Sequence, residues 1–134
     1  MIRNYCEKGD IVFDVDPDDS LIGKQTFQVL NAQYQSSNNW VIYANHVYLK
    51  PNKRGWMGIS KTIPDAILKQ NTYRTEEWRT SALRTYLRDL YVKILPGYLI
   101  EDFKTQKYYF QAHDQFIMRS VVELAGFYHT HYLS

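Results

Sequence analysis

Trp40-Val41-Ile42-Tyr43-Ala44 is the run that sets the fold class, because it is the most apolar strand-like stretch in the chain. Its β-branched and aromatic side chains favour a pleated, buried strand. Two earlier runs extend it into a sheet. Asp10-Ile11-Val12-Phe13-Asp14-Val15 is β-branched and apolar, and Gln25-Thr26-Phe27-Gln28-Val29-Leu30 alternates polar and apolar side chains. Residues 1–50 are therefore expected to form a three-stranded antiparallel meander. In it, Gln33 to Asn39 is a polar segment with Ser36-Ser37-Asn38-Asn39 as the hairpin loop.

Two helices are predicted after this sheet. Pro64 suits the first position of a short helix that runs through Lys69, because its fixed backbone angle and missing amide are tolerated there. Between Ser81 and Lys93, apolar residues recur at spacings of three and four. This pattern predicts an amphipathic helix, and Pro96-Gly97 is expected to end it.

A third helix is predicted near the end of the chain. Ser120 and Glu123 have the spacing of a capping box, so a helix is expected over residues 121–127, after a strand-like run at 115–118. No repeat, low-complexity tract or change of composition divides the chain. Residues 1–134 are therefore predicted to form one α+β domain, a small antiparallel sheet packed with two or three short helices.

Aromatic residues are abundant and make up 16% of the chain, with 12 Tyr, 6 Phe and 3 Trp. This is more than a core of this size comfortably hides. Tyr and Trp can bury a ring while their polar tip stays in water, so part of the surplus is expected at a recognition surface. The alternative is that Tyr serves simply as a strand residue.

Charge and cysteine content restrict the classes of partner and compartment. The formal charge is +2, from 16 basic and 14 acidic residues, so no overall field attracts nucleic acid or an anionic membrane. Cys6 is the single cysteine, which excludes an intrachain disulfide and a cysteine-rich zinc site. The first residues lack the apolar run of a secretory signal, and no stretch approaches the roughly 20 apolar residues of a membrane span. A soluble, cytoplasmic protein is expected.

Three stretches, in order along the chain, share motifs with a known family: Gly9-Asp10-Ile11-Val12 with Phe27-Gln28-Val29-Leu30, Trp78-Arg79-Thr80-Ser81-Ala82-Leu83-Arg84-Thr85-Tyr86-Leu87, and Asp114-Gln115-Phe116-Ile117-Met118-Arg119-Ser120-Val121-Val122-Glu123-Leu124. They resemble a bacterial and phage domain family of unknown function, numbered 6273 among such families. Phe27 stands where the family usually has Trp, and the chain ends at Ser134 without the family's C-terminal segment. The resemblance implies a distantly C-type-lectin-like fold in truncated form.

The last two of these motifs contain residues that are predicted to be structural: Trp78, Ser81, Leu83, Arg84, Tyr86, Leu87, Ser120 and Glu123. Trp78 is expected to fold back on the first turn of a helix capped by Ser81. Leu83 and Leu87 then enter the core, and the Arg84 stem packs along an aromatic ring, that of Trp78 or Tyr86. This arrangement predicts architecture instead of a binding site.

Histidines offer the main candidates for catalysis or metal binding. His129-Thr130-His131 could supply two metal ligands, but no third ligand has a recognisable spacing, so a disordered or surface terminus is expected instead. His46 has no nucleophile beside it to activate. A metal-dependent nuclease or hydrolase that uses His113 or His131 is the enzyme hypothesis, and it ranks last.

An acidic stretch, Asp14 to Ser20, imitates the start of a calcium loop. It fails at two positions, because Asp19 stands where Gly is needed and Gln25 where a bidentate Glu is needed. A solvated turn is therefore expected. No catalytic residue, metal ligand or cofactor is predicted.

The binding prediction falls on the loop from Lys50 to Trp56, which interleaves positive charge with an aromatic residue. Such a loop could grip phosphate and stack a base, or dock on a protein surface. The predicted binding residues are Tyr48, Lys53, Arg54 and Trp56.

The leading functional hypothesis is a non-enzymatic recognition module with a protein partner; a homodimer is also compatible with the aromatic surplus. The family's presence in phages implies a host-interaction or anti-defence protein as one form of it. The lectin-like resemblance implies the alternative, a domain that binds a small molecule or glycan.

Overall fold

The structure is a computed structural model of the whole chain, and it describes residues 2–49, 52, 54–94, 100–102, 107–108 and 113–134. Its centre is a mixed four-stranded sheet in the order β1-β3-β2-β6. The strands are β1 (Ile11–Asp14), β2 (Val41–Ala44), β3 (Arg84–Leu87) and β6 (Thr130–Leu133). β3 pairs antiparallel with both β1 and β2, whereas β2 and β6 run parallel. A separate antiparallel pair joins β4 (Ile100–Asp102) and β5 (Lys107–Tyr108).

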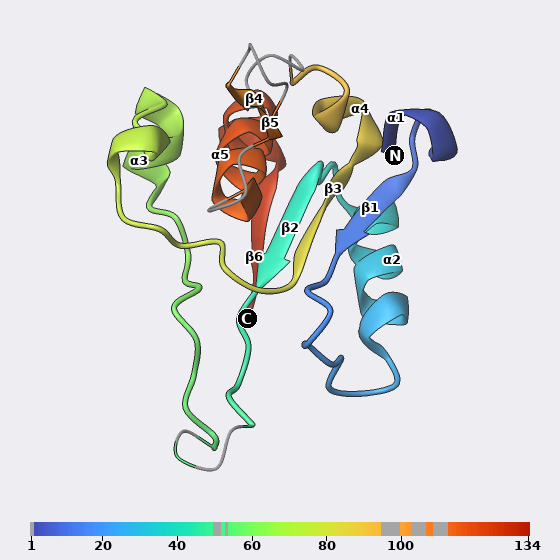
Figure 1. Cartoon of the computed structure of the whole chain (residues 1–134), viewed down its shortest axis with the longest axis vertical. Helices are drawn as coiled ribbons and strands as arrows, with labels where there is room; N and C mark the ends of the chain where they lie inside the picture. Colours follow the sequence, from blue (N-terminus) through green and yellow to red (C-terminus); the bar gives the residue numbers. More distant parts are fainter. Residues whose placement is uncertain (1, 50–51, 53, 95–99, 103–106, 109–112) are drawn as a thin grey trace.

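Helices surround this sheet (Figure 1). The α-helices are α1 (Ile2–Tyr5), α2 (Thr26–Ser36), α3 (Asp65–Gln70), α4 (Arg88–Tyr91) and α5 (His113–Ala125). Two short 3₁₀ turns are η1 (Tyr73–Thr75) and η3 (Phe127–His129). No helix in the described part of the chain is both long and apolar enough to cross a membrane.

α2 and α5 cover opposite faces of the sheet. Side chains along β2 and β3 point alternately to one face and to the other, and each helix contacts one of these two sets. On one face, Tyr43 and Tyr86 are buried in the hydrophobic core together with α5. Ile42 and Thr85 alternate with them and point to the other face, where the Tyr34 hydroxyl of α2 lies 2.9 Å from Thr85 Oγ1. Figure 1 shows the two helices on either side of the strands. The sheet is therefore the middle of three layers.

The predicted α+β class is confirmed, and three elements agree closely with prediction. The expected strand at 10–15 is β1, the run 40–44 contains β2, and the helix expected from Pro64 is α3. α3 ends at Asn71, whose left-handed backbone (φ 55°) lets its amide donate to helix carbonyls. Local propensity and tertiary packing agree in these segments.

The prediction of a strand at 25–30 is wrong, because Thr26–Ser36 forms α2. The antiparallel meander expected over residues 1–50 is wrong as well, because β3 lies between β1 and β2, and β6 makes the sheet mixed. The helix also takes in the first half of the polar segment 33–39 and ends at Ser36, the first residue of the expected loop at 36–39. Phe27, Leu30 and Tyr34 are three and four residues apart, which is helical spacing, and Leu30 and Tyr34 point toward the sheet. The helical spacing is visible only over residues 26–36, whereas the strand was predicted from the alternation of polar and apolar side chains over six residues, 25–30.

The prediction of a helix at 81–93 is also wrong, since its first part is the strand β3 and only Arg88–Tyr91 is helical. Leu83 has a left-handed backbone (φ 44°), which interrupts a helix just before β3. The strand then pairs on both of its edges. The expected stop at Pro96-Gly97 lies outside the described residues.

The capping box at Ser120 is not used as a helix start, because α5 begins at His113 and already contains residues 115–118. α5 ends at Ala125, where Gly126 adopts a positive φ of 69°. The end of the predicted helix at 121–127 was therefore placed within two residues, and its start was not.

Candidate functional site

A long excursion between β2 and Ser60 contains what we call the arm, the described residues 45–49, 52 and 54–59. Its two sides pair as a hairpin: the Tyr48 amide donates to Trp56 O at 2.9 Å, and the Gly58 amide donates to His46 O at 2.7 Å. Figure 1 shows the arm extending away from the sheet. Backbone hydrogen bonds between its two sides therefore hold the arm together, and the arm lies away from the central sheet.

The arm carries a group of apolar side chains that are more than half exposed: Leu49 (62%), Trp56 (63%), Met57 (62%) and Ile59 (55%). Single exposed apolar residues are ordinary on protein surfaces, but a gathering of large ones on one segment marks a contact surface. The arm is thus the candidate recognition surface.

Of the four predicted binding residues, Arg54 and Trp56 are exposed on the arm. Tyr48 is half-buried, and its ring meets the edge of the His46 ring with centroids 4.9 Å apart. Lys53 lies outside the described residues. The backbone pairing of Tyr48 with Trp56 brings these two predicted residues together.

Gly58 and Asn45 fix the base of the arm. Asn45 Nδ2 donates to Gly58 O at 3.1 Å across the hairpin. The His46 ring lies directly against Gly58, where any Cβ would overlap its atoms. Among the described residues, His46 Nδ1 is buried and has no hydrogen-bond partner. A larger residue at position 58 therefore requires the ring or the hairpin to move.

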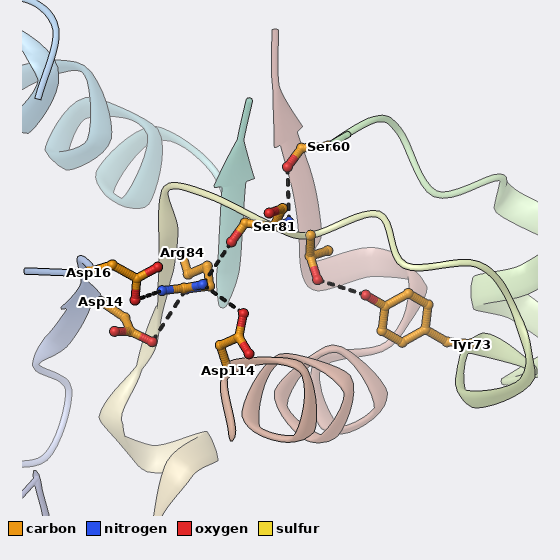
Figure 2. A network of polar contacts seen from close by, with 8 residues as sticks. Asp14, Asp16, Ser60, Tyr73, Ser81, Arg84 and Asp114 are labelled. Carbon is orange, nitrogen blue, oxygen red and sulfur yellow. Dashed lines mark hydrogen bonds and ion pairs between the residues drawn. The ribbon is translucent and has the colours of Figure 1, made fainter. Parts of the chain in front are cut away.

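Arg84 forms the polar centre beside the arm (Figure 2). Only 3% of its side chain is exposed, and its guanidinium meets carboxylates from three segments. Nη2 lies 2.8 Å from Asp16 Oδ1, Nη1 lies 3.0 Å from Asp114 Oδ2, and Nε lies 3.4 Å from Asp14 Oδ2. Nη1 also donates to Ser81 O at 2.9 Å. One cation thus links the end of β1, the loop after it, β3 and α5.

The Arg84 guanidinium meets three carboxylates, as a buried cation requires, and the packing of its stem along Trp78 or Tyr86 stays a prediction. Arg119 lies over Trp78, 6.0 Å from its ring centre, and 5.7 Å from that of Tyr73. Ser81 caps no helix, because the strand β3 follows it, and its amide donates to Ser60 Oγ at 2.9 Å.

Glu123 and Ser120, two more of the residues predicted to be structural, form side-chain hydrogen bonds with Arg74. Glu123 Oε1 accepts a hydrogen bond from Arg74 Nε at 2.6 Å, and Ser120 Oγ accepts one from Arg74 Nη2 at 3.5 Å. They link α5 to η1 instead of capping a helix start. Leu87 packs against the core, as predicted.

A pocket of about 550 Å³ opens between residues 14–22 and the base of the arm. We call it the acidic pocket, because five aspartates and one arginine line it: Asp14, Asp16, Asp18, Asp19, Asp114 and Arg84. Its volume is in the usual range for small-ligand sites. Its remaining walls include the apolar side chains of Leu21, Ile22, Leu49 and Met57.

The electrostatics of the acidic pocket favour a positive ligand. Burial raises the pKa of Asp14 above its ordinary value, and the neighbouring Arg84 opposes this rise. Arg84 neutralises part of the negative charge at Asp14, Asp16 and Asp114. The side chains of Asp18 and Asp19 form no ion pair with any residue that the structure describes. A formal excess of negative charge is left in the pocket.

Within the described residues, no group of three or more His, Cys, Asp or Glu side chains is arranged to hold a metal ion. In the stretch from Asp14 to Ser20, which imitates the start of a calcium loop, Asp14 and Asp16 form ion pairs with Arg84. His113 is exposed at the start of α5. Asp14, Asp16 and Asp114 all lie within ion-pair distance of the Arg84 guanidinium, so these carboxylates surround an organic cation.

The frayed terminus expected at His129-Thr130-His131 is wrong, because residues Thr130–Leu133 form β6. The His129 ring stacks on Trp40 with centroids 3.8 Å apart and an interplanar angle of 3°. Its Nδ1 lies 2.6 Å from Asn38 O. His129 therefore fixes the start of the edge strand.

No family model, curated protein or solved structure matches the chain. The resemblance to the family of unknown function stays a prediction.

Proposed function

We propose that the protein is a non-enzymatic recognition module that binds a protein partner through the arm. The observation that supports it is the gathering of Leu49, Trp56, Met57 and Ile59, all more than half exposed, on a hydrogen-bonded hairpin. Such side chains lose contact with water when a partner covers them, and this burial favours association.

Trp56 is the proposed anchor of this surface. Tryptophan is enriched among interface residues whose truncation costs about 2 kcal/mol or more. Its ring is 63% exposed, and the two hairpin bonds between Tyr48 and the segment 55–56 hold the backbone beside it. A backbone that is already ordered loses less entropy on binding. Arg54 beside it supplies a charge for the rim of the contact.

The direct test is photo-crosslinking from single positions of the arm in an extract of the source cells. A photoreactive phenylalanine at position 56 is compared with one at position 128, since Tyr128 is an exposed aromatic residue on η3. We expect one discrete protein adduct from position 56 and none of that mass from position 128. Equal adducts from both positions would contradict the proposal.

Two further attributes belong to this proposal. We infer a cytoplasmic location, which the single free Cys6 supports because such a thiol suits a reducing compartment. A second copy of this chain is the alternative partner, and crosslinking from position 56 would then yield a dimer of the protein itself.

Small-molecule binding is the second candidate function, and the acidic pocket is the observation that favours it. A glycan fits the lining less well than an organic cation does. Sugars stack on aromatic faces, whereas the described lining offers Tyr48 as its one Tyr or Trp residue and five carboxylates. Thermal stabilisation by a neutral sugar, without stabilisation by organic cations, would favour the glycan alternative.

A further inference from the structure

Resting on the proposed function, we propose that the acidic pocket takes a lysine or arginine side chain of the partner. The pocket adjoins the exposed surface of the arm, because Leu49 and Met57 belong to both. A partner segment lying on the arm therefore passes the pocket opening.

Charge complementarity selects a cation as the occupant. Arg84 donates a hydrogen bond to one oxygen each of Asp114 and Asp16 and lies 3.4 Å from one oxygen of Asp14, and each ionised carboxylate has several acceptor positions. Asp18 and Asp19 add two more carboxylates on the turn after β1. A second guanidinium or an ammonium group entering the pocket gains charge-assisted hydrogen bonds there.

The apolar walls select an organic cation over a bare ion. Leu21 and Ile22 lie on one side of the pocket and are 41% and 64% exposed, and Leu49 and Met57 lie on the arm side. The hydrocarbon stems of lysine and arginine pack along such surfaces while the charged head reaches the carboxylates. The aspartates and the apolar walls thus match the two parts of one basic side chain.

The test uses N-acetyl-arginine amide and N-acetyl-lysine amide as probes, with N-acetyl-citrulline amide as the uncharged control. Amide chemical shifts of the full chain are followed by two-dimensional NMR during titration. We expect saturable shifts at residues 14–22 and 45–48 with both cationic probes and none with citrulline. The double variant D18N/D19N should weaken probe binding about fivefold, because two exposed carboxylates are lost.

The matched control is D65N, since Asp65 is an exposed aspartate on α3 whose partner is Lys69. It should leave probe affinity unchanged. Equal binding of the citrulline probe, or unchanged affinity in D18N/D19N, overturns the proposal. Calcium chloride producing the same shifts at the same concentration also overturns it, because the site would then select inorganic cations.

Failure of this inference differs from failure of the proposed function. If W56A weakens partner binding while D18N/D19N does not, the arm binds the partner and the pocket assignment is wrong. If the cationic probes bind the pocket while W56A leaves partner affinity unchanged, the arm is not the partner's contact surface.

Discussion

Arg84 Nη1 lies 3.0 Å from Asp114 Oδ2, so this ion pair joins the strand β3 to the first turn of α5. The same guanidinium reaches Asp16 on the other side. Segments separated by 30 and 68 residues in sequence therefore meet at one buried cation.

Removing this cation should destabilise the fold. R84M leaves three carboxylates close together without their counter-ion, and we expect a loss of about 2–3 kcal/mol in the free energy of unfolding. This is below the roughly 3–5 kcal/mol of fully buried pairs, because Asp16 and Asp114 are partly exposed. Urea denaturation measures it, with R54A on the exposed arm as the control. Equal stability of R84M and R54A would contradict the account.

The same variant should change the titration of Asp14. Its pKa is raised by burial and held down by Arg84, so R84M should raise it further. The ordinary value is 3.8, and a higher value in the folded state means that ionisation of Asp14 disfavours folding. Lowering the pH through the folded pKa toward 3.8 removes this penalty. Carbon NMR of the Asp14 carboxyl measures the shift, and a lower pKa in R84M would refute the assigned cause.

Buried tyrosines should make the protein sensitive to alkali. Burial raises the pKa of Tyr34 to about 12 and also raises the pKa values of Tyr43, Tyr73 and Tyr86 above 10.0. The folded state favours the protonated phenols, so this stability is complete below pH 10.0 and is lost as pH rises through the folded pKa values. Tyrosinate absorbance and urea midpoints follow both events. Y34F should lose part of the alkaline decline, and an identical decline would argue against burial of Tyr34.

Gly58 should be required for an ordered arm. In G58A the new methyl group overlaps the His46 ring, so either the ring or the hairpin must move. We expect faster hydrogen exchange at the Tyr48 and Gly58-position amides, both of which donate across the hairpin. The double variant G58A/H46A removes the overlap and should restore slow exchange. Equal exchange in G58A and the double variant would show that the ring is not the obstacle.

Local sequence patterns predicted those elements whose tertiary setting agrees with them. The apolar run at 40–44 becomes the fully buried β2, and Pro64 precedes α3. The segment 81–93 shows the opposite case, because Leu83, Leu87 and Leu90 have helical spacing and yet β3 forms there. β3 makes backbone hydrogen bonds to β1 on one side and to β2 on the other, and this tertiary pairing outweighs the local pattern.

The site was predictable in part for the same reason. Exposure of Arg54 and Trp56 follows from a polar loop rich in turn residues, as the structure has it. The Arg84 cluster has no local signal, because its carboxylates come from residues 14–16 and from Asp114, both distant from Arg84 in sequence. Only the pairing of β1 with β3 and the placement of α5 bring them together.

The most direct measurement of the central claim is the dissociation constant of the crosslinked partner, once purified, for W56A and Y128A. Both variants remove one exposed aromatic side chain, from the arm and from η3 respectively. The account predicts about thirtyfold weaker binding for W56A, which corresponds to about 2 kcal/mol, and unchanged binding for Y128A. Unchanged affinity in W56A, or the same loss in both variants, would contradict recognition through the arm.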